Sequence, residues 1–268
     1  MSIFRCGKYM LDLSKKTYVM GILNLTPDSF SDGGDFNTLE LALKRAKEIE
    51  NEGADIIDIG AQSTRPGYIK ISEEEELKRL APALKEICKS VKIPVSIDTF
   101  YSSVAYEALN LGASVINDVT GFKDNNMFEV VKGSDCGCII MHDMPGLNIK
   151  SFFNAQLNKA ESFGFDKQRL CFDPGIGFGK SYEENLYILK NPYEFKIEDI
   201  AILIGASRKR VIGMSCGNPP FKERLCGTIA AHVLAVAGGA NIVRVHDVKE
   251  TVQAVKVADS ILRENEMN

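Results

Sequence analysis

The sequence predicts an α/β protein that folds as a single-domain (β/α)₈ TIM barrel, and three observations support this. Short apolar runs alternate with amphipathic helical stretches, and eight such units follow one another along the chain. No linker rich in Pro, Gly and Ser divides the 268 residues, which suit one barrel domain. A doubly wound open sheet is the alternative, but no G-x-G-x-x-G follows the first run, which disfavours it.

Eight apolar runs are the expected strands. Each is apolar at nearly every position, as in parallel strands that are buried on both faces. In order, the runs are YVMGILN (18–24), DIIDIG (55–60), PVSID (94–98), SVINDV (114–119), CIIMH (138–142), LCFD (170–173), IAILIG (200–205) and NIVRVH (241–246). We expect residues 1–17 to form an N-terminal extension that caps the barrel bottom, and residues 18–268 to form the barrel.

The stretches between the runs have helical patterns. In 248–262, apolar residues recur at intervals of three and four and give one apolar face. Ser72 followed by Glu75 is a capping-box pattern that predicts the start of a helix. The acidic run Glu73–Glu76 falls in the first turn, where carboxylates suit the helix dipole. We interpret this run as a solvated face rather than a metal site.

Composition excludes several classes of protein. The net charge of −4 and the lack of a Lys/Arg cluster argue against a nucleic-acid surface. No apolar run approaches the ~20 residues that cross a bilayer, and the first residues lack a signal-peptide core. We therefore expect a cytoplasmic protein without a membrane segment. The seven cysteines are then reduced thiols, and a structural zinc site at Cys136 and Cys138 is the less favoured alternative.

Polar side chains stand at or just after the carboxyl ends of the expected strands, where barrel enzymes build their active sites. Helix N-caps explain two or three of these residues but not so many on one rim. In chain order they are Asn24, Asp98, Asn117 with Asp118, His142, Asp173, Lys209, Arg244 and His246. The pattern predicts an active site at this end of the barrel.

These side chains suggest two kinds of recognition. One group offers the donors and acceptors that read a flat, amide-like heterocycle; it consists of Asp98, Asn117, Asp173 and Lys209. The other is more cationic and follows strands seven and eight, where barrels often bind phosphate; it consists of Asn24, Arg244 and His246. The residues alone therefore favour a small polar heterocycle that carries an anionic group.

Simpler roles remain open for several residues. His142 could only satisfy a buried hydrogen bond, and His232, inside a helical pattern, is expected to serve packing or the surface. Lys209 could form a Schiff base, but it lies in a loop beyond the apolar strand. The stretch FDPGIGFGKS (172–181) is similar to a nucleotide phosphate loop, but Pro174 replaces the first required glycine. Lys180 within it could be a solvated charge.

Seven segments together resemble the dihydropteroate synthase family. They span nearly the whole chain in the family's order, and TPDSFSDGG combined with SRK is specific. The segments are GILNLTPDSFSDGG (21–34), DIGAQSTRPG (58–67), SIDT (96–99), IND (116–118), DPGIGFGK (173–180), SRK (207–209) and RVHDV (244–248). The resemblance implies a barrel transferase of folate biosynthesis, usually a homodimer. Such an enzyme joins 6-hydroxymethyl-7,8-dihydropterin pyrophosphate to para-aminobenzoate, and releases 7,8-dihydropteroate and pyrophosphate.

The resemblance also implies roles for individual residues. The pterin would be held by Asp98, Asn117, Asp173, Lys209 and Phe178. The pyrophosphate would be held by Asn24, Arg244 and His246, and Asn24 would also meet the cofactor Mg²⁺. The para-aminobenzoate side and the closing loops would include Phe30, Asp32, Thr64, Arg65, Pro66 and Ser207, with Asp32 helping to organise the cation site. Sulfonamides are expected as competitive ligands.

The chain departs from the family pattern in its loops. Ala61-Gln62 stands where the family usually has Gly-Glu, Asp143–Gly146 replaces a short Met-containing sequence, and Arg210 replaces a serine near the aminobenzoate. These changes affect the second-substrate side more than the pterin pocket.

Two alternative functions remain: a pterin-dependent methyltransferase, which needs no pyrophosphate site, and a non-catalytic paralogue that binds pterin. Arg244, His246 and the TPDSFSDGG loop argue against the methyltransferase.

Overall fold

Eight parallel strands form a closed barrel in a computed structural model, which describes residues 2–25, 35–62 and 69–263, the side chains of 35–38 excepted. Around the barrel the order is β10-β3-β4-β5-β6-β7-β8-β9, so each strand pairs with its neighbours in sequence and the last closes on the first. The strands are β3 (Tyr18–Asn24), β4 (Ile56–Gly60), β5 (Val95–Asp98), β6 (Val115–Asp118), β7 (Gly137–Met141), β8 (Leu170–Asp173), β9 (Ala201–Ile204) and β10 (Ile242–Val245). The predicted (β/α)₈ barrel is confirmed.

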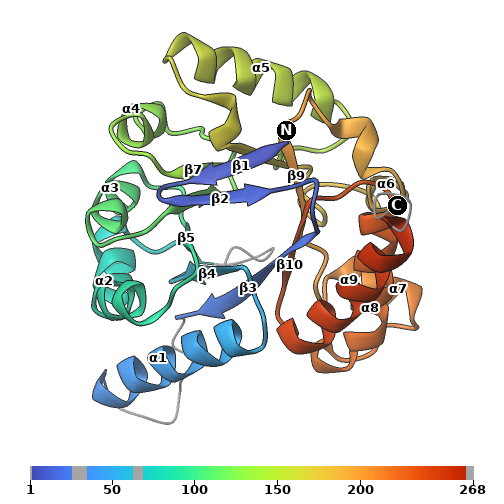
Figure 1. Cartoon of the computed structure of the whole chain (residues 1–268), viewed down its shortest axis with the longest axis horizontal. Helices are drawn as coiled ribbons and strands as arrows, with labels where there is room; N and C mark the ends of the chain where they lie inside the picture. Colours follow the sequence, from blue (N-terminus) through green and yellow to red (C-terminus); the bar gives the residue numbers. More distant parts are fainter. Residues whose placement is uncertain (1, 26–34, 63–68, 264–268) are drawn as a thin grey trace.

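Helices surround the barrel (Figure 1). They are α1 (Asp35–Asn51), α2 (Glu73–Ser90), α3 (Ser102–Asn110), α4 (Met127–Lys132), α5 (Ile149–Ser162), α6 (Tyr182–Lys190), α7 (Arg210–Ser215), α8 (Leu225–Ala237) and α9 (Val248–Leu262). Short 3₁₀ turns lie at Lys167–Arg169, Pro192–Phe195 and Phe221–Glu223. Among the helices of the described ranges, none has the length and apolar character needed to cross a membrane.

The start of α2 follows the predicted capping pattern in part. The Ser72 hydroxyl accepts a hydrogen bond from the Glu75 N–H at 3.2 Å, while the Glu75 carboxylate pairs with Arg79 at 2.8 Å. The interpretation of Glu73–Glu76 as a solvated face is wrong for its last member, because Glu76 is fully buried. Glu76 lies four and eight residues before Leu80 and Leu84, which are also buried, so all three share the helix face that packs on the barrel.

A hairpin of β1 (Ile3–Cys6) and β2 (Tyr9–Asp12) precedes the barrel and lies across one of its ends (Figure 1). Phe4, Cys6 and Leu11 are buried and form one apolar cluster with side chains from the barrel interior, such as Met20 and Ile56. A second, larger cluster fills the layer between strands and helices. The hairpin therefore fills the end of the barrel where the strands begin.

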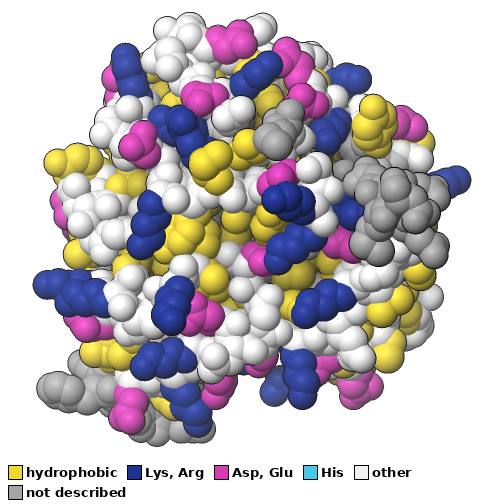
Figure 2. Space-filling model, in the orientation of Figure 1, with side chains coloured by type: hydrophobic (Ala, Val, Ile, Leu, Met, Phe, Trp, Pro, Cys, Tyr) yellow, Lys and Arg dark blue, Asp and Glu magenta, His cyan; other side chains and the backbone are white. Residues whose placement is uncertain are grey.

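The surface on the hairpin side mixes charges of both signs. In Figure 2, Lys and Arg side chains are interspersed with Asp and Glu over the whole visible face. Polar and functional side chains gather at the opposite end of the barrel, where the strands finish.

Candidate active site

A cavity of about 830 Å³ opens at the carboxyl ends of the barrel strands. Nine predicted residues of the described ranges line this cavity, whereas Asp118 and His142 of the predicted rim do not: the nine are Asn24, Asp98, Asn117, Asp173, Phe178, Ser207, Lys209, Arg244 and His246. These side chains come from the ends of five strands and from the loops after β8 and β9, because parallel strands bring their carboxyl ends to one rim. The other predicted residues, Phe30, Asp32, Thr64, Arg65 and Pro66, lie outside the described residues.

Arg244 connects the two groups that the sequence suggested. Its Nε donates to Asp58 Oδ2 at 2.6 Å, and its Nη2 donates to Asp98 Oδ2 at 2.8 Å. Asn117 Nδ2 also donates to Asp58 Oδ2, at 3.1 Å. The arginine of the cationic group is therefore bonded directly to a carboxylate of the heterocycle-reading group, so the two groups are in contact.

Asp58 is a site residue that the sequence reasoning missed. It is fully buried in β4, where it reads as one residue of an apolar run. A signal was present in the strand, since Asp58 is two residues after Ile56, which points into the barrel interior. Side chains alternate along a strand, so Asp58 had to face inward as well.

Burial and charge pairing both shift the pKa values of these groups. It raises the pKa of Asp98 to about 7, an effect that the neighbouring Arg244 opposes and the Asp58 charge reinforces. Burial alone would lower the pKa of Arg244, but the carboxylates of Asp58 and Asp98 outweigh it and raise that pKa. Arg244 therefore stays charged at any pH the protein meets.

Asp173 and Lys209 form a second pair of opposite charges, at the end of β8 and in the loop after β9. Asp173 Oδ1 accepts a 2.7 Å hydrogen bond from the Gly175 N–H, and Lys209 Nζ donates to the Ile176 carbonyl at 2.5 Å. Burial raises the pKa of Asp173 and lowers that of Lys209 to about 8, and the attraction between the two charges opposes both shifts. Lys209 Nζ also lies 4.7 Å from the centre of the Phe178 ring, so the lysine and the ring are close neighbours.

The loop after β8 is held against the loop after β7. Gly175 has a φ of +75°, and a Cβ there would lie 2.1 Å from the His142 carbonyl oxygen, so only glycine fits. Lys180 Nζ donates to the carbonyls of His142, Met144 and Phe178 at 2.9, 3.2 and 3.2 Å. The interpretation of Lys180 as a solvated charge is wrong, and burial lowers its pKa to about 8.

Two histidines have structural contacts. His142 is buried, its Nε2 lies 3.1 Å from Asn148 Oδ1, and it is not among the residues that line the cavity. This agrees with the alternative of a buried hydrogen bond. His232 is fully buried and its Nε2 accepts from the Ala206 N–H at 3.2 Å. Burial lowers the His232 pKa to about 4, so this ring is neutral and serves packing rather than the surface.

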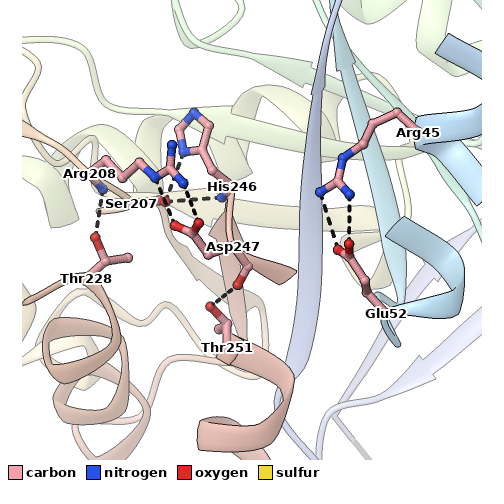
Figure 3. A network of polar contacts seen from close by, with 8 residues as sticks. All are labelled: Arg45, Glu52, Ser207, Arg208, Thr228, His246, Asp247 and Thr251. Carbon is pink, nitrogen blue, oxygen red and sulfur yellow. Dashed lines mark hydrogen bonds and ion pairs between the residues drawn. The ribbon is translucent and has the colours of Figure 1, made fainter. Parts of the chain in front are cut away.

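A polar network fixes the turn that presents Lys209 (Figure 3). Ser207 Oγ lies 2.9 Å from His246 Nδ1 and accepts from the His246 N–H at 3.1 Å. Arg208 forms a bidentate ion pair with Asp247, with its Nε 2.9 Å from Oδ2, and its N–H donates to Thr228 Oγ1 at 2.9 Å. The SRK turn is thus tied to the end of β10 and to α8.

Gln62 and Glu76 form a second contact that the sequence did not reveal. Gln62 lines the cavity, and its Nε2 donates to Glu76 Oε2. Burial raises the pKa of Glu76 to about 7, although bonds from Thr99 and Gln62 oppose the shift. The Gln62 amide therefore supplies a donor to the Glu76 carboxylate at the edge of the cavity.

Asp118 lies on the predicted rim but serves its own turn. Its Oδ1 accepts from the N–H and the hydroxyl of Thr120, both at 2.7 Å, and its Oδ2 accepts from the Phe122 N–H at 3.0 Å. It is fully buried and does not line the cavity.

Arg210, one of the departures from the family, is exposed at the cavity rim as the first residue of α7.

Comparisons with known proteins identify the family of this chain. The family model described as "Pterin binding enzyme" matches residues 20–246. A dihydropteroate synthase of Clostridium beijerinckii is 44% identical, over 97% of this chain and 99% of the relative. A dihydropteroate synthase of Clostridium difficile, solved in the presence of pteroic acid, superposes with a TM-score of 0.89 at 46% identity and covers 93% of this chain and 98% of its own.

A second solved structure is similar over nearly the same length of this chain. The Xanthomonas albilineans dihydropteroate synthase, solved with 4-aminobenzoic acid, gives a TM-score of 0.91 at 38% identity, over 97% of this chain and 98% of its own. Full-length similarity in sequence and fold, together with the nine predicted residues in one cavity, leads to one assignment. This chain belongs to the family of pterin-binding enzymes, and within it to the dihydropteroate synthases, which are transferases.

Proposed function

We propose that the protein joins 6-hydroxymethyl-7,8-dihydropterin pyrophosphate to para-aminobenzoate, forming 7,8-dihydropteroate and pyrophosphate. One observation carries the proposal: residues that suit a pterin ring and residues that suit an anion share one cavity and meet at the Arg244–Asp98 ion pair. A substrate with a flat polar ring and an attached pyrophosphate matches this arrangement, because its two parts are also directly linked.

The acids and amide of the cavity bind the ring. Asp98 Oδ1 is buried and has no hydrogen-bond partner among the described residues, so it is available to an N–H group of the ring. Asn117 both donates and accepts, and Asp173 offers a further carboxylate on the other side. Lys209 can donate to a ring carbonyl or nitrogen while it lies against Phe178.

The cationic side chains assist the departure of pyrophosphate. As the bond between the methylene carbon and the pyrophosphate oxygen breaks, the electron pair leaves with that oxygen. Arg244 and an N–H group of His246 can stabilise the growing negative charge. The dihydropterin ring delocalises the positive charge left on the methylene carbon. The amine of para-aminobenzoate then attacks this carbon and loses a proton, and because an aromatic amine is already neutral at pH 7, we assign no strong general base.

Mg²⁺ fits this cavity as a cofactor. No group of three or more His, Cys, Asp or Glu side chains within the described ranges is placed to hold a metal alone. Asn24, however, offers an amide oxygen at the cavity wall, and Mg²⁺ commonly takes one or two protein oxygens together with water and substrate phosphates. Asn24 would therefore hold the ion, which when bound would supply positive charge to the pyrophosphate.

The oligomeric state, the cellular location and the inhibitors of the protein are also proposals. We propose a homodimer, because α8 exposes an apolar stripe to solvent, with Leu234 63% exposed. We also propose a cytoplasmic location, because all seven cysteines are free thiols, as in a reducing compartment. Sulfonamides are proposed as competitive ligands of the para-aminobenzoate side, where Ser207 and Arg210 lie at the cavity.

The direct test is a two-product assay. Purified protein is incubated with Mg²⁺, the dihydropterin pyrophosphate and para-aminobenzoate, and pyrophosphate and dihydropteroate are both quantified. We expect equal amounts of the two products. Pyrophosphate without dihydropteroate would show that the second-substrate side has diverged. Neither product, with pterin still bound, would contradict the proposal and favour a methyltransferase or a non-catalytic paralogue.

A further inference from the structure

Asp58 bonds to two side chains that the proposed reaction uses, Arg244 and Asn117, and through Arg244 it is linked to a third, Asp98. It is fully buried in β4, and a single oxygen, Oδ2, accepts from both Arg244 Nε at 2.6 Å and Asn117 Nδ2 at 3.1 Å. Arg244 in turn donates to Asp98 at 2.8 Å. Neither the resemblance nor the proposed reaction gives Asp58 a role, although it bonds to a residue of each recognition group.

The contacts of Arg244 use only one edge of its guanidinium group. That group has five N–H donors in a fixed plane. The Nε and Nη2 atoms lie along one lateral edge, and this edge faces the carboxylates of Asp58 and Asp98. The distal edge, between Nη1 and Nη2, keeps its donors, and the side chain lines the cavity with 20% of its surface exposed. Two parallel N–H groups on such an edge match two phosphate oxygens.

We propose that Asp58 is a positioning residue that fixes which edge of Arg244 meets the leaving pyrophosphate, and that it couples this edge to ring binding through Asn117. The inference rests on the proposed function. Without the Nε contact, the guanidinium group can rotate about its long side chain and offer several edges, and ordering it then costs entropy when the anion binds. With the contact, the distal edge is oriented before the substrate arrives.

The test compares two probes that differ only in the anion: 6-hydroxymethyl-7,8-dihydropterin and its pyrophosphate, titrated by calorimetry with Mg²⁺. The dissociation constant of the plain pterin divided by that of the pyrophosphate is the ratio of interest. It is larger the more the pyrophosphate contributes to binding. Asp58→Asn keeps the shape and an acceptor oxygen but removes the charge. We expect this variant to lower the ratio about tenfold, because hydrogen bonds to charged groups are the strong ones. Plain pterin should lose less affinity.

Other roles for Asp58 predict different results. If Asp58 only stabilises the fold, both affinities fall together with the melting temperature and the ratio is unchanged. If Asp58 is only a counter-ion that repels the anion, its neutralisation raises the ratio. Either result would overturn the inference and leave the proposed function standing. A wild-type protein that binds neither probe would overturn the proposed function, and this inference with it.

A matched control is available at the end of β6. Asp118 is equally buried, but its carboxylate accepts from Thr120 and Phe122 in its own turn and does not line the cavity. Asp118→Asn should lower the melting temperature and leave the ratio unchanged. A ratio that falls as much in Asp118→Asn as in Asp58→Asn would show a general effect of losing a buried acid, and would overturn the inference.

A measurement on the wild-type protein tests the inference even if Asp58→Asn does not fold. The Arg244 Nε–H should exchange slowly with solvent in nitrogen-15 NMR spectra, both without ligand and with the pterin pyrophosphate bound, because Asp58 accepts from it throughout. Fast exchange of this proton in the bound state would show that Arg244 leaves Asp58 when the anion binds, and would overturn the inference.

Discussion

The buried acids around the cavity are each stabilised in a different way. Asp98 faces the Arg244 guanidinium, Asp173 faces Lys209 and a backbone N–H, and Asp118 accepts three hydrogen bonds from its own turn. Glu76 accepts a side-chain hydrogen bond from an uncharged group, the Gln62 amide, and its Oε1 has no hydrogen-bond partner among the described residues. Its charge is therefore poorly compensated, which explains why burial raises its pKa to about 7.

This pKa makes stability depend on pH. Glu76 releases its proton near pH 4.5 in the unfolded chain and near pH 7 in the folded protein. Between these values the folded protein holds the extra proton, so the contribution of Glu76 is full below pH 4.5 and is lost as the pH rises through 7. Glu76→Gln has no carboxyl group at this position, so its stability does not decrease in this way as the pH rises. Relative to wild type, its free energy of unfolding should rise by about 3 kcal/mol between pH 4.5 and pH 8, measured by urea unfolding.

Glu75→Gln provides the comparison, since Glu75 is in the same helical turn but its side chain is 42% exposed and pairs with Arg79. Its effect should change by less than about 0.5 kcal/mol over the same range. Equal pH dependence in the two variants would contradict a buried, proton-binding Glu76.

At the scale of elements, the strands were predictable because buried parallel strands are apolar at nearly every position. In β3, β5, β6 and β8 the run also ends at or next to a polar side chain that lines the cavity. The runs 18–24 and 170–173 match β3 and β8 at both ends. The runs 55–60 and 94–98 lose their first residue, and 114–119, 200–205 and 241–246 lose one residue at each end. The run 138–142 corresponds to β7, which starts one residue earlier, at Gly137. Gly137 packs closely on the hairpin, since a Cβ there would lie only 2.7 Å from the Phe4 ring.

The rest of the site depends on contacts between elements, which periodicity does not describe. Arg244 is 186 residues from Asp58 and 146 residues from Asp98. The barrel was predictable, and it placed the polar strand ends on one rim. Which of those ends bond to each other depends on side-chain direction and register. Glu76 was misjudged for the same reason, since its helix face is defined only by the barrel behind it.

The hairpin allows an element-scale prediction. Phe4 is fully buried between the hairpin and the lower barrel, whereas Met10, on the paired strand, is 66% exposed. Phe4→Ala should lower the free energy of unfolding by about 3–5 kcal/mol because it removes a buried ring and leaves a cavity. Met10→Ala should change it by less than about 0.5 kcal/mol. Both are measured by chemical unfolding, and similar small losses in both variants would show that the hairpin is not part of the barrel core.

At the scale of the whole molecule, stability and recognition occupy opposite ends of the barrel. The hairpin and the inner apolar cluster fill the end where strands begin, and the cavity occupies the end where they finish. This separation is typical of barrel enzymes. Pterin affinity in a folded Phe4→Ala variant should therefore stay close to that of wild type.

The outer face of α8 concerns a different kind of contact. Its 13 residues include no Asp, Glu, Lys or Arg. A helix without charged residues is normally covered by other protein on its outer face as well as its inner face. Cys226, Ala230, Leu234 and Ala237 form an exposed apolar stripe along it. The adjacent α9 adds two exposed side chains, Val257 at 56% and Ile261 at 69%. Exposed apolar surface that spans two packed helices is typical of a subunit interface.

The proposed homodimer should therefore be sensitive to charge at this stripe. Light scattering of the wild-type protein should give twice the chain mass of 29.5 kDa. Leu234→Lys places a charge where the interface would remove water, so dimer affinity should fall by on the order of a hundredfold and the protein should become monomeric at micromolar concentration. Met10→Lys adds the same charge at a similarly exposed residue on the hairpin, and should leave the mass unchanged. A wild-type monomer, or a dimer that Leu234→Lys leaves intact, would show that α8 does not form the interface.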